Sequence, residues 1–128
     1  MIVDDAVARI REETALEPLV GVVLGSGLGG LADELDARVE VPFQDIPGWP
    51  VSTALGHAGT LVLGTLAGVP IAVMRGRAHL YEGIAADRVA FGVRVLGRLG
   101  IRSLVVTNAA GGINTDYRPG LLVLSRIT

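Results

Sequence analysis

The 128-residue chain contains no cysteine and no lysine, and aromatic residues make up only 4% of it. Without cysteine the chain has no disulfide and no thiolate metal ligand. All 11 basic residues are arginine, so a Schiff-base lysine and the lysine of a P-loop are both excluded. Any anion that this protein binds must therefore be held by arginine, histidine or backbone amides.

The chain also lacks an excess of charge and a long apolar run. A net charge of -2 and a pI of about 5.6 give no basic surface for nucleic acid or for an anionic membrane. Half of the residues are hydrophobic, but the longest nearly apolar stretch, 19–32, is interrupted by glycine and serine and is too short to cross a bilayer. The first residues are acidic, unlike those of an export signal. We therefore expect a cytoplasmic protein that binds neither nucleic acid nor membrane.

The length corresponds to a single domain, residues 1–128. Apolar spacing predicts helices over 4–16 and 84–99 and a short one over 31–35. Apolar runs and period-two alternation predict strands over 19–25, 37–43, 60–66, 69–74 and 101–108, with a further candidate over 120–125. Ala67 and Gly68 have the spacing of a two-residue hairpin turn, and 44–59 is expected to be a proline- and glycine-rich loop. The fold class is therefore α/β, with a mixed central sheet flanked by helices.

Three polar clusters each follow a predicted buried strand. "GSGLGG" comes after Leu24, "RGRAHLYEG" after Met74 and "TNAAGGIN" after Val106. An open α/β sheet forms its ligand crevice at the carboxyl ends of its strands. We therefore expect the three clusters to converge on one site.

The "GSGLGG" segment suits an anion, because its glycines expose backbone amides and the Ser26 hydroxyl adds a donor. A purely structural glycine turn is an alternative. The same letters fit a dinucleotide-binding pattern at Gly25, Gly27 and Gly30. However, the segment from Gly30 to the next strand is too short for a crossover helix, which disfavours a dinucleotide site.

The "RGRAHLYEG" segment suits phosphate, because Arg77 offers a guanidinium fork and His79 an imidazole donor. Along an extended segment Arg77, His79 and Tyr81 alternate to the same face, so all three can reach one ligand. A solvated charged loop is the alternative interpretation. We expect Arg75 to be solvated.

The remaining polar candidates are His57 and Asn108. His57, in "STALGHAG", either closes over a ligand or is an ordinary surface histidine. Asn108 offers a donor and an acceptor beside small residues, although a tight structural turn explains that segment as well. The two histidines have no carboxylates at ligand spacing, which argues against a metal site.

Four segments, "VVLGSGLGGLADEL", "PGWPVSTALGHAG", "MRGRAHLYEG" and "VTNAAGGIN", resemble the amino-terminal half of the homotrimeric purine nucleoside phosphorylases in order and separation. The resemblance implies a phosphorylase fold and a pentosyltransferase of purine salvage. Such an enzyme uses inorganic phosphate to cleave purine (deoxy)ribonucleosides to the free base and (deoxy)ribose 1-phosphate. The resemblance implies no metal and no organic cofactor, since phosphate is a co-substrate, and it implies a homotrimer for the full-length family.

The resemblance also assigns roles to individual residues. It implies phosphate binding by Ser26, His57, Arg77, His79 and the Ala109 amide. It implies nucleoside binding by Tyr81, Asn108 and Ala109, with Tyr81 against the ribose. His79 and Tyr81 are the residues that it implies for catalysis.

The chain departs from the family in length, because family members are about twice as long. The family's second half carries the residues that bind the purine, so we expect a truncated or misframed gene product or a fragment. The preference for 6-oxopurines or 6-aminopurines stays open. A catalytically inactive remnant that binds phosphate or nucleoside is the alternative function. The related methylthioadenosine phosphorylases fit less well, because "STALGHAG" with His57 is more similar to the purine nucleoside type.

Overall fold

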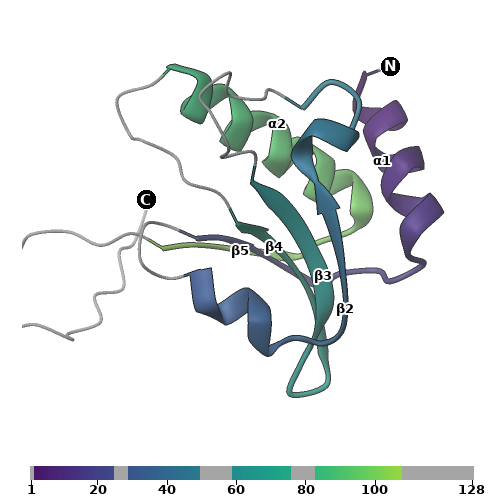
Figure 1. Cartoon of the computed structure of the whole chain (residues 1–128), viewed down its shortest axis with the longest axis vertical. Coiled ribbons are helices and arrows are strands. Elements are labelled where there is room, and N and C mark those ends of the chain that lie inside the picture. Colours follow the sequence, from purple (N-terminus) through teal and green to yellow (C-terminus); the bar gives the residue numbers. More distant parts are fainter. Residues whose placement is uncertain (1, 25–28, 50–58, 76–82, 108–128) are drawn as a thin grey trace, which may run out of the picture.

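A computed structural model describes residues 2–24, 29–49, 59–75 and 83–107, which form a mixed five-stranded sheet with helices on both faces (Figure 1). The sheet order is β2-β3-β4-β1-β5. The α-helices α1 and α2 lie on one face, and the short 3-10 helix η1 lies on the other. The elements are α1 (Ile2–Glu13), β1 (Val20–Val23), η1 (Gly29–Glu34), β2 (Asp36–Pro42), η2 (Phe43–Asp45), β3 (Thr60–Leu66), β4 (Val69–Arg75), α2 (Gly83–Leu99) and β5 (Ser103–Val106). The predicted α/β class and mixed sheet are confirmed.

The predicted hairpin joins β3 to β4. Leu66 pairs with Val69, and the two turn residues between them, Ala67 and Gly68, have positive φ angles of 51° and 82°. Two successive left-handed residues are typical of a type I′ turn, whose twist matches that of the flanking strands. Gly68 adopts this conformation readily, whereas Ala67 adopts it at a steric cost.

The two faces of the β3–β4 hairpin are both buried, because alternate side chains point to opposite sides of the sheet. Leu61, Leu63, Ala72 and Met74 belong to the core under the helices, together with Ala6 and Ile10 of α1 and Val95, Leu96 and Leu99 of α2. Val62, Ile71 and Val73 belong to a second cluster, together with Val22 of β1, Leu24 beyond its end, and Ala32 and Leu35 of the η1 region. The centre of the sheet is therefore covered on both sides.

Helix α2 ends at a glycine in the left-handed conformation. Gly100 has a φ of 107°, and the amides of Gly100 and Ile101 donate to the carbonyls of Gly97 and Leu96, both at 3.2 Å. These two bonds form a Schellman motif, which satisfies carbonyls that the helix itself leaves unpaired. This confirms the predicted end of the helix.

The segment after β2 is more ordered than a proline- and glycine-rich loop. Residues 43–45 form η2, and Trp49 stacks on Phe43 with ring centroids 4.4 Å apart. Phe91 of α2 packs edge-on against Trp49 at 5.6 Å. The expected loop over 44–59 thus begins within η2, and its residues 46–48 form a bend and a turn held by the buried Trp49. Residues 50–58 of the expected loop lie outside the described residues.

The expectation that β5 is buried was wrong. Leu104, Val105 and Val106 are 41%, 46% and 60% exposed. β5 is the edge strand of the described sheet and pairs with β1 on one side only. An apolar sequence alone does not distinguish a covered strand from an uncovered edge strand. The candidate strand over 120–125 lies outside the described residues.

Among the helices that the structure describes, none combines the length and the apolarity that crossing a membrane requires.

Candidate functional site

Three strands end side by side at one edge of the sheet. β4 and β5 both run parallel to β1, one on each side, and Val23 lies opposite both Met74 and Val106. Two backbone bonds extend this register: the Leu24 amide donates to the Met74 carbonyl at 3.1 Å, and the Thr107 amide donates to the Val23 carbonyl at 2.9 Å. The strands that precede the three polar clusters therefore end side by side. Ligands of open α/β sheets bind at this side of the sheet, beyond the carboxyl ends of the strands.

The segment that carries His57 ends at the same edge. The antiparallel register places Thr60, the first residue of β3, opposite Arg75, the last residue of β4. The Gly59 carbonyl beside it accepts a bond from the Phe43 amide at 3.0 Å. All four sequence motifs thus adjoin described residues at one edge of the sheet.

The predicted site residues themselves lie outside the described residues. They are Ser26, His57, Arg77, His79, Tyr81, Asn108 and Ala109. The structure fixes the residues from which they continue, which are Leu24, Gly59, Arg75 and Thr107. The individual roles of the seven residues therefore stay predictions.

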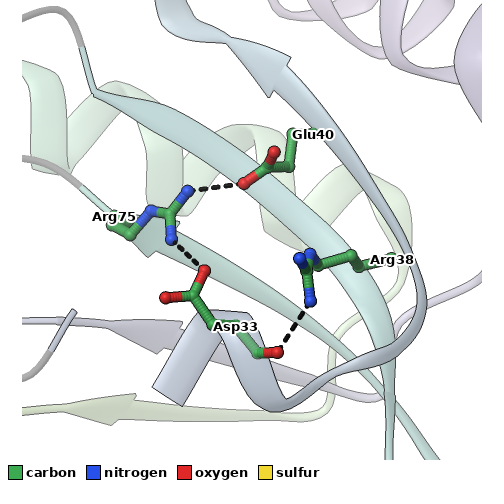
Figure 2. A network of polar contacts seen from close by, with 4 residues as sticks. All are labelled: Asp33, Arg38, Glu40 and Arg75. Atoms are coloured by element: carbon green, nitrogen blue, oxygen red, sulfur yellow. Dashed lines mark hydrogen bonds and ion pairs between the residues drawn. The ribbon is translucent and has the colours of Figure 1, made fainter. Parts of the chain in front are cut away.

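Arg75 is not the solvated residue that the sequence suggested. Its Nη1 lies 2.8 Å from Oδ1 of Asp33, and its Nη2 lies 2.5 Å from Oε1 of Glu40 (Figure 2). The Arg75 side chain is only 29% exposed. Arg38 joins the group by donating from Nη1 to the Asp33 backbone carbonyl at 2.7 Å.

This contact group, Asp33, Arg38, Glu40 and Arg75, connects η1, β2 and β4. Two carboxylates and two guanidiniums leave it electrically neutral. Sequence reasoning missed both carboxylates: Asp33 lies in the "VVLGSGLGGLADEL" segment without an assigned role, and Glu40 lies in none of the four segments. Only the folded sheet brings them to Arg75. Because both ends of the Arg75 guanidinium contact carboxylates, Arg77 is the arginine of "RGRAHLYEG" that we expect to bind an anion.

The topology disfavours the dinucleotide alternative. A dinucleotide-binding unit connects its first strand through a helix to an adjacent parallel strand. Here β1 is followed by the short η1 and then by β2, which pairs with β3 at the far edge of the sheet. The glycine pattern at Gly25, Gly27 and Gly30 thus follows a strand of a different architecture.

No group of three or more histidine, aspartate or glutamate residues within the described ranges is arranged to hold a metal ion. His57 and His79 lie outside those ranges.

Comparison with known proteins gives a consistent result. Residues 19–126 match the family model described as the phosphorylase superfamily. The chain is 51% identical over 122 residues to purine nucleoside phosphorylase 1 of Bacillus subtilis, a match that covers 95% of this chain and 45% of that protein.

Two solved structures of purine nucleoside phosphorylase from Schistosoma mansoni are also similar. The complex with inosine superposes with a TM-score of 0.80 at 39% identity and covers 91% of this chain and 41% of that one. Isoform 2 in complex with cytosine and ribose-1-phosphate gives a TM-score of 0.81 at 41% identity, covering 89% and 40%. The chain thus spans less than half the length of these relatives. The matched family model, over most of the chain, and the arrangement of the sheet show that this chain belongs to the phosphorylase superfamily.

Proposed function

We propose that this chain forms the phosphate- and ribose-binding part of a purine nucleoside phosphorylase. The reaction is phosphate-dependent cleavage of a purine (deoxy)ribonucleoside to the free base and (deoxy)ribose 1-phosphate. The observation that carries the proposal is the alignment of the β4, β1 and β5 ends, since these strands lead into the three motifs at one edge. The similar Schistosoma mansoni structures contain inosine in one case and ribose-1-phosphate in the other.

Phosphate is the ligand that the available side chains suit best. In a chain without lysine, the Arg77 fork and the His79 imidazole supply the charged and polar donors. Ser26, His57 and the Ala109 amide complete the proposed set. Donors that hold phosphate beneath the anomeric carbon lower the entropic cost of attack. Inorganic phosphate is the co-substrate in this proposal, and no metal or organic cofactor takes part.

The sugar and base occupy the neighbouring space in this proposal. Tyr81 packs against the ribose, and Asn108 and Ala109 lie by the phosphate and base. The transition state resembles an oxocarbenium ion, so an anionic phosphate held close to the sugar stabilises the charge that develops there. His79 and Tyr81 are the proposed catalytic residues, because they contact the reacting phosphate and sugar.

Calorimetry with inorganic phosphate tests the binding half of this proposal. We expect the chain to bind phosphate and the Arg77→Ala variant to lose most of that affinity, because a bidentate charged contact is removed. Arg98→Ala is the matched control, since Arg98 pairs with Asp4 between α2 and α1, outside the four motifs. Equal phosphate affinity in the chain and in Arg77→Ala would exclude Arg77 from the site.

The share of the relatives that the chain covers, less than half, favours one alternative: a phosphate- or nucleoside-binding remnant without turnover. Incubation with inosine, with and without phosphate, separates the two. Phosphate-dependent release of hypoxanthine supports the enzyme, whereas phosphate binding without release supports the remnant. A homotrimeric assembly and a cytoplasmic location complete the proposal, and the purine preference is to be determined with the same assay on adenosine.

A further inference from the structure

We propose that Arg75 is a positioning residue for phosphate binding, which fixes the segments that carry the phosphate ligands relative to one another. This inference rests on the proposed function. Arg75 stands two residues before Arg77 and four before His79, at the last position of β4. Any displacement of this strand end is therefore passed directly to the proposed phosphate ligands.

The first carboxylate partner of Arg75 belongs to the element that follows the glycine-rich segment. Asp33 lies in η1, which begins at Gly29, and its Oδ1 accepts from Arg75 at 2.8 Å. Arg38 holds the same residue through its backbone carbonyl. The Arg75–Asp33 ion pair thus connects the end of β4 to η1, the element that follows the segment with Ser26.

The second partner connects the same strand end to β2, which pairs with β3, the strand that follows the segment with His57. Glu40 lies on β2, where it pairs with Val62, and Pro42 of the same strand pairs with Thr60. Thr60 is also the residue opposite Arg75 in the β3–β4 register. One guanidinium therefore contacts η1, which follows the segment with Ser26, and β2, which pairs with the strand that follows the segment with His57.

The charges of this group add a second effect. Arg75 supplies one of the two positive charges that balance Asp33 and Glu40 close to the edge where phosphate is proposed to bind. Replacing it by a neutral residue leaves this group with one excess negative charge, which would repel an incoming phosphate. The Asp33 and Glu40 side chains are 61% and 43% exposed, so the effect is moderated by solvent and salt.

Phosphate titration of the full chain by calorimetry tests the inference with four variants. We expect Arg75→Gln to bind phosphate roughly fivefold more weakly, the scale of two partly exposed ion pairs. Arg75→Lys should be intermediate, because an ammonium is a point charge that does not span two carboxylates as the fork does. Adding Glu40→Gln to Arg75→Gln should recover part of the affinity, because one repelling charge is removed. Arg98→Gln, which removes an ion pair of 2.5 Å between α2 and α1, should leave phosphate affinity unchanged.

The outcomes separate this inference from the proposed function. If the unaltered chain binds phosphate and Arg75→Gln binds it equally well, Arg75 has no positioning role and the proposed function stands. If the unaltered chain does not bind phosphate, the proposed function fails and the inference fails with it. Circular dichroism confirms folding of each variant. Should Arg75→Gln not fold, Arg75→Lys carries the test, and wild-type phosphate affinity in that variant overturns the inference.

Discussion

Gly92 of α2 packs against Met74 of β4 and Trp49, and a side chain there has no free space. A Cβ at this position would lie 2.4 Å from Cε of Met74 and 2.9 Å from Cζ2 of Trp49. Met74 and Trp49 are each only 4% exposed, so the surrounding core limits their movement. Overpacking of this kind costs roughly 1–3 kcal/mol, while replacing glycine by alanine inside a helix gains about 1 kcal/mol. We therefore expect Gly92→Ala to be destabilised by about 1 kcal/mol.

Gly97 provides the matched control in the same helix. A Cβ there would meet no atom within 4 Å, so Gly97→Ala should gain roughly 0.5–1 kcal/mol from helix propensity alone. The two variants differ by the same single methyl group. Their stabilities should therefore differ by about 2 kcal/mol in opposite directions from the unaltered chain.

Urea denaturation measures this difference. Trp49 is the single tryptophan and is buried, so its fluorescence follows unfolding. Far-UV circular dichroism reports the secondary structure of the whole chain and provides a second signal that does not depend on the environment of Trp49. With a urea m-value of roughly 2 kcal/mol/M, the two midpoints should lie about 1 M apart. A midpoint for Gly92→Ala at or above that of Gly97→Ala would refute the packing argument.

Two further predictions concern the β3–β4 turn and the sheet edge. Ala67→Gly should stabilise the chain by up to about 1 kcal/mol, because Ala67 has a φ of 51° and the left-handed region costs alanine but not glycine. The same urea titration measures this change in stability. Gly68→Ala, at a φ of 82°, should destabilise the chain for the same reason. Val106→Lys should reduce self-association at high protein concentration, because Val106 is 60% exposed on an edge strand and a lysine there opposes edge-to-edge pairing. Sedimentation velocity measures the self-association of the variant. The control Val62→Thr, at a position buried in the hairpin, should lower stability and not self-association. Self-association unchanged by Val106→Lys would exclude β5 as the contact.

Local patterns predicted the parts of the fold that are locally determined. The hairpin at Ala67 and Gly68, the end of α2 at Gly100 and the five observed strands each follow from residues close together in the chain. The strand ends that lead into the site were predicted for the same reason. Their meeting at one edge, a consequence of the expected α/β class, is confirmed by the parallel pairing of β4, β1 and β5.

What the sequence did not predict depends on contacts between distant segments. Arg75 was expected to be solvated, but Asp33 and Glu40 reach it once η1 and β2 have packed. The aromatic packing of Trp49 on Phe43 and Phe91 likewise depends on where α2 lies. All seven proposed site residues were assigned from motifs, and these assignments stay predictions; they are Ser26, His57, Arg77, His79, Tyr81, Asn108 and Ala109.

The sheet order has a consequence for how the chain folds. β1 is the first strand in the sequence, yet it lies between β4 and β5, with Val20 opposite both Ile71 and Ser103. Pairing β1 with β4 and β5 closes long stretches of chain, which is entropically costly, whereas the β3–β4 hairpin closes over two residues. β1 is therefore expected to wait for strands synthesised after it and to enter the sheet after the hairpin has formed. Substitutions in the hairpin should then slow folding, while substitutions in β1 should mainly accelerate unfolding.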